Sequence, residues 1–284
     1  MQIKQALTEA IVKFKEATIE SAHLDARILL SHVLNQPAEY LLARNNDKLT
    51  NNEQEKFFSL TKRRLALEPI AYIVGYKEFY GRMFEVNKKV LIPRTDTEIL
   101  IDAILSFAHS NKRSELCILD LGTGSGCIII SLLLEIASSS AIAIDICNEA
   151  LSIAKRNASL HNVDSKLELI YSHWFDNLTP KKFDIIVSNP PYIAETDRDL
   201  VSKETINYEP ALALFAEQNG LNAYHSIAAS AKDFLKKDGK LFIEVGFNQA
   251  NIVSQIFISQ GYRIDQIYKD IAKHSRVIAI SLES

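Results

Sequence analysis

The residues best suited to chemistry are four in succession, Asn189, Pro190, Pro191 and Tyr192. They follow the apolar run 183–188, which is typical of a buried strand. That strand must end at the prolines, because neither has an N–H for a strand ladder. The turn leaves backbone carbonyls without ladder donors, beside an amide side chain and an aromatic ring. These groups suit a planar –NH2 group, and the alternative is a purely structural Pro-Pro turn.

A glycine-rich turn stands upstream, where the apolar strand expected around 117–120 ends. Its candidate cofactor-binding residues are Asp120, Leu121, Gly122, Thr123 and Gly124. Glycines let the backbone approach a ligand closely with positive φ, and the N–H groups of the following helix start favour an anionic group. A dinucleotide fingerprint has the spacing G-x-G-x-x-G/A, whereas here the third glycine is Gly126 and Cys127 follows it. The spacing therefore fits an S-adenosylmethionine site better than a nicotinamide site.

Besides Asn189, which is expected to contact the cofactor as well, two further side chains are expected in the cofactor site. Asp145 ends the next apolar strand, about 20 residues beyond the glycine turn, where a carboxylate can accept hydrogen bonds from ribose hydroxyls. The alternative for Asp145 is an ordinary helix start near Asn148. Trp174 is the only tryptophan and follows the third strand. It stands where an adenine needs a stacking or edge partner, and a half-exposed core aromatic is the alternative.

Composition excludes several classes of function. The chain has 284 residues, 47% of them hydrophobic and 24% charged, which is typical of a globular protein with one large domain or two smaller ones. The net charge of −3 provides no basic field for nucleic acid. No apolar run reaches transmembrane length, so no membrane partner is expected. The cysteines and histidines lack metal-ligand spacing, so we expect no metal site, and three scattered cysteines suit a reducing cytoplasm.

The elements that must position these residues fall into three parts. Residues 1–75 have apolar side chains at helical spacing and predict a helical bundle, 76–93 predict a β-hairpin connector, and 94–284 alternate strands with helices. The alternation predicts an α/β domain with a mostly parallel, doubly wound sheet. Strands are expected around 117–120, 141–145, 167–171, 183–188 and 240–245, with an antiparallel final pair at 262–268 and 277–282.

Three local patterns add detail to this layout. Thr50 and Glu53 form a capping-box pattern ahead of a helix. The basic run 62–64 predicts a solvated helix face. Lys236-Lys237-Asp238-Gly239 predicts the end of a helix, with a basic last turn followed by a glycine stop.

Topology predicts that the two motifs meet. Ligands of open α/β sheets bind beyond the carboxyl ends of the strands, at the topological switch point. If the sheet reverses direction after its first strand, the ends of the first and fourth strands are neighbours. A methyl donor on the glycine turn would then face the acceptors at Asn189.

The whole chain resembles the HemK/PrmC family, the peptide release factor glutamine N5-methyltransferases. The residues that carry the resemblance are Leu91-Ile92-Pro93-Arg94, Thr97-Glu98, 120–126, Asp145, Trp174, 189–192 and Glu209-Pro210-Ala211-Leu212. The glycine turn and the Asn-Pro-Pro-Tyr motif occur in many methyltransferases, whereas their combination with the helical part and the Ile-Pro-Arg segment is far more specific. Two places depart from the family pattern: Thr95 replaces a common proline, and the segment 216–221 lacks a glycine pair.

The resemblance implies a fold and a reaction. The fold is a seven-stranded class I S-adenosylmethionine-dependent methyltransferase sheet with a reversed last strand. The substrate is the glutamine of the Gly-Gly-Gln motif in class I release factors, which the helical domain would hold, with no nucleic acid bound directly. Asn189 Oδ1 and the Pro190 carbonyl would accept both N–H bonds of the glutamine amide, and Tyr192 would pack on the amide plane. The catalytic set is then Asn189, Pro190 and Tyr192, with Pro191 beside them in the substrate site.

Other classes of protein compete with this interpretation. A methyltransferase for the exocyclic amine of a nucleic-acid base uses the same acceptor geometry, but it needs a basic groove or an added recognition domain. A nicotinamide oxidoreductase is disfavoured by Cys127 and by the lack of a proton-donor motif. A catalytically dead binding module, with the helical bundle as its active part, is a third reading. The sequence ends directly after its last expected strand, so it could also be part of a longer fused polypeptide.

Overall fold

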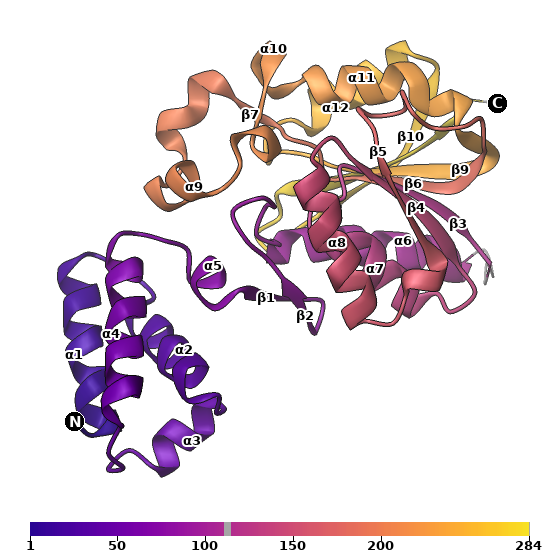
Figure 1. Ribbon diagram of the computed structural model, residues 1–284. Coiled ribbons are helices and arrows are strands. Elements are labelled where there is room, and N and C mark those ends of the chain that lie inside the picture. Colours follow the sequence, from indigo (N-terminus) through magenta and orange to yellow (C-terminus); the bar gives the residue numbers. More distant parts are fainter. Residues whose placement is uncertain (111–114, 284) are drawn as a thin grey trace. The chain divides into compact units, whose positions relative to one another are not determined.

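The computed structural model describes residues 1–110 and 115–283. By their internal contacts these residues divide into two units. The helical unit comprises Met1–Tyr76 and Ser202–Tyr208, and the sheet unit comprises Lys77–Val201 and Glu209–Ser284. Figure 1 traces the chain from the indigo helices of the first unit to the yellow strands of the second.

The helical unit is built from amphipathic helices around one apolar core. Its helices are α1 (Ile3–Glu16), α2 (Ala22–Leu34), α3 (Ala38–Ala43), α4 (Asn51–Leu65), α5 (Ile70–Val74) and α9 (Lys203–Tyr208). Their fully buried side chains include Phe14, Leu29, Leu30 and Phe57. The capping box is confirmed, because the Thr50 hydroxyl accepts from Glu53 N at 3.3 Å and the Glu53 carboxylate accepts from Thr50 N at 2.7 Å.

The prediction of a solvated basic face on α4 is wrong for one of its residues. Arg64 is only 5% exposed. Its Nε donates to Asp25 Oδ2 at 2.6 Å, and its Nη1 pairs with Glu204 Oε2 at 2.9 Å. Tyr208 O–H also donates to Ala66 O at 2.8 Å, so α9 is attached to α4 inside the helical unit. Local charge could not predict this burial, because both carboxylates come from distant parts of the chain.

The sheet unit contains a seven-stranded sheet in the order β10-β11-β9-β6-β3-β4-β5. Its strands are β3 (Cys117–Leu121), β4 (Ser140–Asp145), β5 (Leu167–Tyr171), β6 (Phe183–Ser188), β9 (Leu235–Glu244), β10 (Tyr262–Lys269) and β11 (Ser275–Leu282). All neighbours are parallel except at β11, which is antiparallel to both β9 and β10. The predicted mostly parallel, doubly wound sheet with a reversed last strand is confirmed.

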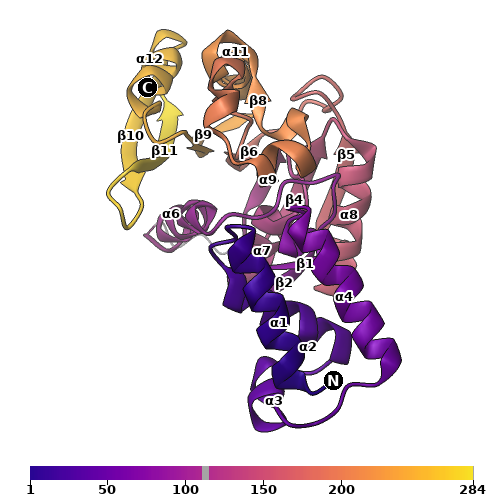
Figure 2. The same cartoon turned by 90° about the vertical axis from the view of Figure 1, so that its left-hand side faces the viewer.

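Helices cover both faces of this sheet (Figure 1). One face packs against α6 (Glu98–Ser110), α7 (Cys127–Glu135) and α8 (Asn148–Leu160), and the other against α11 (Asn222–Ser230) and α12 (Ala250–Ser259). Successive strand residues supply opposite faces, since Ile118 joins the first core and Leu119 the second. Figure 2 shows the two edges, with β10 beside α12 at one and β5 beside α8 at the other.

Short elements complete the sheet unit. The connector is a hairpin of β1 (Tyr76–Phe79) and β2 (Arg82–Glu85), and the turn Tyr80–Gly81 joins its strands. Beyond β6, β7 (Ile193–Ala194) pairs with β8 (Phe215–Ala216), and α10 (Glu217–Gly220) follows.

The prediction that a helix ends at 236–239 is wrong. The helix α11 already ends at Ser230, and these residues lie inside β9. A register shift interrupts the pairing of β9 with β6. There, a Cβ on Gly239 would lie 2.9 Å from Phe183 O, so glycine is needed for a close backbone approach in the strand. Lys236 pairs with Asp184 Oδ2 of β6 at 2.8 Å, so its charge joins two neighbouring strands and does not cap a helix.

Candidate active site

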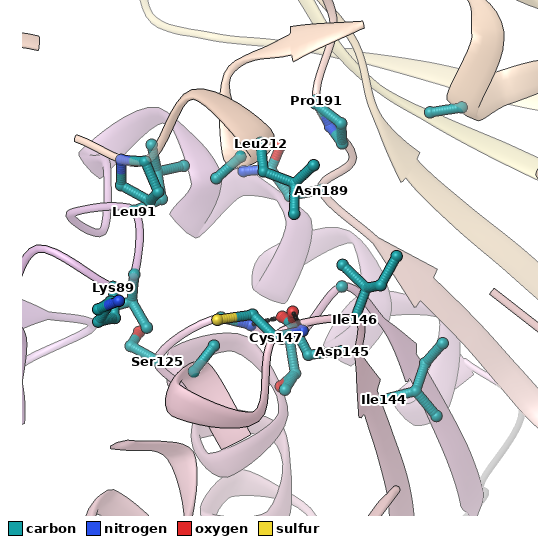
Figure 3. A pocket seen from close by; sticks show the side chains of 18 of the residues that line it. Lys89, Leu91, Ser125, Ile144, Asp145, Ile146, Cys147, Asn189, Pro191 and Leu212 are labelled. Atoms are coloured by element: carbon teal, nitrogen blue, oxygen red, sulfur yellow. Dashed lines mark hydrogen bonds between the residues drawn. The ribbon is translucent and has the colours of Figure 1, made fainter. Parts of the chain in front are cut away.

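A cavity of about 790 Å³ opens at the carboxyl edge of the sheet unit. Figure 3 shows its lower wall, with Ser125, Asp145 and Cys147, and its upper wall, with Asn189, Pro191 and Leu212. The two motifs meet because β3 pairs with β6, which sets Leu121 opposite Ser188 at the strand ends. The predicted neighbourhood of the glycine turn and the Asn-Pro-Pro-Tyr motif is therefore confirmed.

The glycine turn forms the floor of the cavity. Gly122, Gly124 and Gly126 have φ of 76°, 56° and 80°, which favours glycine at each position. A Cβ on Gly122 or Gly124 would meet nothing within 4 Å, so a ligand can approach this backbone. A Cβ on Gly126 would instead lie 2.9 Å from Ile130 Cδ1. The first two glycines leave space for a ligand, and the third lets the helix pack closely.

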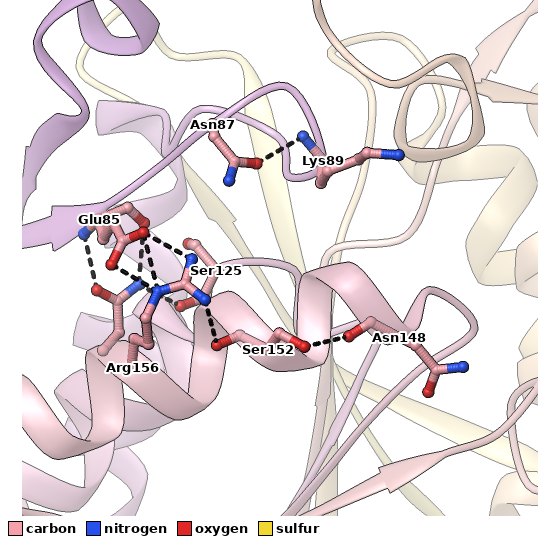
Figure 4. Close-up of polar contacts among 8 residues, drawn as sticks. Glu85, Asn87, Lys89, Ser125, Asn148, Ser152 and Arg156 are labelled. Carbon is pink, nitrogen blue, oxygen red and sulfur yellow. Dashed lines mark hydrogen bonds and ion pairs between the residues drawn. The ribbon is translucent and has the colours of Figure 1, made fainter.

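A buried amide fixes this turn from behind. Asn157 is fully buried on α8, and its Nδ2 donates to Ser125 O at 2.8 Å. Its Oδ1 accepts from Glu85 N at 2.7 Å, so the hairpin and the glycine turn share one anchor. Arg156 pairs with the Glu85 carboxylate on the exposed side of the same contact (Figure 4). The connector thus holds the floor of the cavity in place.

Asp145 is half-buried at the end of β4 and lines the cavity. Its carboxylate accepts from Gly124 N and Cys147 N, both at 2.9 Å. Burial raises the pKa of Asp145, and the backbone hydrogen bonds from Gly124 and Cys147 oppose that rise. The carboxylate keeps unused lone pairs toward the cavity side, which is the requirement for accepting ribose hydroxyls.

Asp120 and Leu121 lie behind the floor and outside the cavity lining. Asp120 is fully buried, and in the described part of the chain neither of its carboxylate oxygens has a hydrogen-bond partner. Burial raises the pKa of Asp120 to about 7, and the Asp145 charge adds to the rise. The Thr123 hydroxyl lies near enough to oppose the rise without forming a hydrogen bond of normal geometry. An unpaired carboxylate under a ligand cavity is unusual and points to a functional demand. Thr123 itself lines the cavity.

Trp174 lies in the cavity wall, as the sequence predicted for an adenine contact. Its backbone is left-handed, with φ of 47°, and Ser172 Oγ donates to its carbonyl at 2.9 Å. Ile146, which no sequence pattern singled out, lines the same wall and is 40% exposed. An aromatic and an aliphatic side chain here suit a flat heterocycle.

The Asn-Pro-Pro-Tyr motif is divided between the cavity wall and its support. Asn189 and Pro191 line the cavity, whereas Pro190 and Tyr192 do not. The Tyr192 ring packs against the apolar cluster behind the wall, and burial raises its pKa to about 12. Gln249 Nε2 donates to Tyr192 O at 2.9 Å and holds the turn. The Tyr192 backbone also lies close to Gly220, where a Cβ would be 2.2 Å from its oxygen.

Three polar residues of the site were not assigned a role from the sequence. Glu209 Oε2 accepts from Ile92 N at 3.1 Å and its Oε1 pairs with Arg94, so it ties two cavity segments together. Thr97 lines the cavity, and its Oγ1 accepts from Asn189 Nδ2 at 3.2 Å. Glu244 is buried at the end of β9. An acid at the carboxyl end of a strand was the signal used for Asp145, and it could have found Glu244.

The described residues contain neither a metal-ligand cluster nor a membrane-spanning helix. No group of three or more His, Cys, Asp or Glu side chains in 1–110 and 115–283 could hold a metal ion. No helix in the same ranges is long and apolar enough to cross a membrane.

Comparison with known proteins agrees with this geometry. Residues 5–75 match the family described as PrmC N-terminal domain, and residues 96–212 match the methyltransferase small domain. The solved catalytic domain of hMettl16, in complex with an RNA hairpin, is 16% identical with a TM-score of 0.58 and covers 83% of each chain. At this identity the likeness supports the methyltransferase fold alone.

Curated relatives are closer in sequence. The chain is 50% identical to a bifunctional methyltransferase of Rickettsia typhi over 98% of its length, but it spans 57% of that relative. It is 39% identical to a release factor glutamine methyltransferase of Francisella tularensis, and the match covers 96% of this chain and 95% of the relative. The chain therefore belongs to the release factor glutamine methyltransferase family.

Proposed function

We propose that this chain transfers a methyl group from S-adenosylmethionine to the side-chain amide nitrogen of the glutamine in the Gly-Gly-Gln motif of class I peptide release factors. One observation carries the proposal: Asn189 shares a cavity with the glycine turn, and its Nδ2 is occupied by Thr97. Its Oδ1 remains to accept a hydrogen bond from a substrate –NH2. Membership of the release factor glutamine methyltransferase family supports the choice of substrate.

The cavity floor suits the methyl donor. Gly122 and Gly124 offer backbone that a ligand can approach, Asp145 offers a carboxylate for the ribose, and Trp174 with Ile146 offers a flat wall for the adenine. When bound, S-adenosylmethionine supplies an electrophilic methyl group on a sulfonium. The open Cβ positions at Gly122 and Gly124 fit a ligand that approaches the backbone of this turn. Asp120 lies behind the turn and outside the cavity lining, so any charge that it carries acts on the ligand without contact.

The acceptor side has to position a weak nucleophile. An amide nitrogen reacts poorly because its lone pair is delocalised into the carbonyl. Asn189 Oδ1 would accept one of its N–H bonds, and the Pro190 carbonyl, which lies just outside the cavity lining, would accept the other. The two acceptors would hold the nitrogen in line with the methyl group. A C–N bond forms as the S–C bond breaks, and the nitrogen then loses one proton to water. The protein therefore contributes mainly positioning and preorganised dipoles, with Tyr192 and Pro191 supporting the acceptor turn.

The helical unit is proposed to hold the release factor, as a protein partner in the cytoplasm. Its match to the PrmC N-terminal domain supports this role. The chain spans 57% of the length of the bifunctional methyltransferase of Rickettsia typhi.

A transfer assay tests the proposal. Labelled S-adenosylmethionine is incubated with the protein and a recombinant class I release factor, beside a release factor whose Gly-Gly-Gln glutamine is replaced by alanine. Mass spectrometry then locates the added methyl. Label on the wild-type glutamine alone supports the proposal, whereas label only in total RNA or DNA transfers the assignment to a nucleic-acid amine.

A further inference from the structure

Behind the acceptor wall, two buried polar side chains lie near Asn189. Ser188 of β6 pairs with Ile243 of β9, so Asn189 and Glu244 come next at adjacent strand ends. Thr97 is 2% exposed and comes from the short 3-10 turn Thr95–Thr97, and Glu244 is 3% exposed and ends β9. Asn189 Nδ2 donates to Thr97 Oγ1 at 3.2 Å. Glu244 lies outside the cavity lining, so any influence on a substrate must pass through a neighbour.

The chemistry of these groups fixes the direction of the hydrogen bonds. An ionised carboxylate only accepts hydrogen bonds, whereas a hydroxyl donates one and accepts others. Glu244 Oε2 is buried and has no hydrogen-bond partner among the described residues, so it can receive the Thr97 hydroxyl proton. Thr97 then keeps its lone pairs to accept from Asn189. The Asn189 amide must then place Nδ2 toward Thr97 and Oδ1 away from it. A flipped amide would set its oxygen against the Thr97 lone pairs and present a donor to the incoming –NH2 group.

We infer that Glu244 and Thr97 are positioning residues that hold the Asn189 amide with its oxygen toward the substrate. The inference rests on the proposed function for its catalytic consequence, because that function needs an acceptor at Asn189. The structural part of the inference does not depend on that function: the orientation of the Asn189 amide depends on the buried Glu244 carboxylate.

The charge state of Glu244 makes the orientation of the Asn189 amide depend on pH. The titratable and charged side chains that act on it, or on which its charge acts, are Arg276, Asp96, Tyr192, Tyr224 and Cys127. Burial raises the pKa of Glu244 to about 7, and the Thr97 hydroxyl, the Arg276 charge and the Asn189 amide oppose that rise. Arg276 is itself shared with Asp96 and Asp270, each at 2.8 Å.

Protonation converts Glu244 from an acceptor into a donor. A protonated Glu244 can donate to Thr97, whose hydroxyl then turns toward Asn189 and favours the amide oxygen on its own side. The transfer rate should therefore fall as the pH drops through about 7 and level off above it. Asp120 beneath the cofactor floor also has a pKa raised to about 7, so the rate is measured at saturating S-adenosylmethionine and the pH dependence is assigned to Glu244 by its loss in Glu244→Gln.

Matched variants test the inference in the full chain with a recombinant release factor. Glu244→Gln keeps the shape but adds a donor, and Thr97→Val keeps the shape but removes the hydroxyl. Both should lower kcat about 10- to 100-fold while the Kd for S-adenosylmethionine stays within about twofold, as for a lost preorganised dipole. Thr97→Ser should recover most of the rate. The control Asp184→Asn removes a carboxylate at the opposite end of β6 and should retain the wild-type pH profile.

A pH profile separates positioning from a general loss of stability. In Glu244→Gln, the fall in kcat below about pH 7 (the acid limb of the pH–rate profile) should vanish, because the glutamine side chain cannot ionise. A Glu244→Gln variant that folds normally and keeps both the wild-type kcat and the limb would overturn the inference. If Glu244→Gln does not fold, Thr97→Val against Thr97→Ser decides the same question, and equal rates for these two would overturn it.

A measurement without release factor distinguishes failure of this inference from failure of the proposed function. The side-chain ¹⁵N–¹H₂ resonances of Asn189 should shift with pH around 7 in the wild type and stay constant in Glu244→Gln. Such a shift supports the positioning role even if the wild type transfers no methyl to the release factor. Its absence counts against the role even if transfer is rapid.

Discussion

The two walls of the cavity are built in different ways. The floor that faces the proposed methyl donor is mostly backbone, with glycines at positive φ and amide groups that bind Asp145. The acceptor wall instead depends on a single side-chain amide, Asn189, held by Thr97. Backbone sites tolerate the loss of one side chain better than side-chain sites do. A substitution on the acceptor wall should therefore affect the rate, and one on the floor should affect binding or stability.

Asn189→Ala should give the largest effect and the sharpest contrast between the walls. The variant loses the proposed acceptor for the substrate –NH2, so transfer should fall by about 10²–10³-fold or more. The Kd for S-adenosylmethionine should change little, because the floor keeps its glycines and Asp145. Single-turnover transfer and calorimetric cofactor binding measure the two quantities. Equal losses in both would remove the distinction between the walls.

Asp120→Asn tests whether the buried Asp120 carboxylate behind the floor is charged without a compensating partner. The folded pKa of Asp120 is raised from 3.8 to about 7, so the folded state binds the proton more tightly than the unfolded state. This term makes the protein less stable as the pH rises from about 4 to about 7, and the penalty is complete above that range. Between pH 4 and pH 8, the free energy of unfolding of Asp120→Asn should rise by about 2–4 kcal/mol relative to that of the wild type.

Denaturant unfolding without cofactor at several pH values checks this expectation. The stability difference between the variant and the wild type should grow as the pH rises from about 4 to about 7 and then level off. Parallel stability curves from pH 4 to pH 8 would show that Asp120 ionises in the folded protein with its ordinary pKa, so that its charge is compensated.

Gly126→Ala separates packing from ligand access within the floor. Its Cβ would lie 2.9 Å from Ile130 Cδ1 and 3.2 Å from Ala154 Cβ, at a φ of +80°. Left-handed strain and overpacking together should lower the free energy of unfolding by about 2–4 kcal/mol. The matched control is Gly261→Ala, with a φ of +82° and no atom within 4 Å, which should lose only about 1–2 kcal/mol. Equal losses of stability in the two variants on thermal unfolding would show that backbone strain alone accounts for the effect at Gly126.

The walls also differ in how far the sequence could predict them. The floor follows a local motif, and the structure places five of its predicted residues in the cavity lining: Gly122, Thr123, Gly124, Asp145 and Trp174. Asp120 and Leu121 lie outside the lining, and the strand order brings Asn189 to the floor. Cofactor binding by these residues stays a prediction. The support of the acceptor wall was missed. Thr97 and Glu244 are single polar residues on separate elements, and only the tertiary structure brings them to Asn189.

The errors of the sequence analysis have the same origin. The buried pair of Arg64 with Asp25 joins residues 39 apart, and no local pattern encodes it. The Lys-Lys-Asp-Gly run fits a helix end as well as a strand with a register shift. Its pairing with β6, which no window of sequence contains, decided between the two.

Asp145→Asn should give the smallest effect, because the backbone of the glycine turn also contributes to binding the cofactor. The variant keeps one oxygen for Gly124 N or Cys147 N, but it loses the charge that strengthens hydrogen bonds to ribose hydroxyls. The Kd for S-adenosylmethionine should rise about tenfold, which corresponds to about 1.4 kcal/mol, with kcat at saturation within about threefold. Isothermal titration and saturation kinetics measure both. A variant with unchanged Kd and a strongly reduced kcat would reverse the roles of the two walls, because a floor residue would then behave as Asn189 is expected to behave.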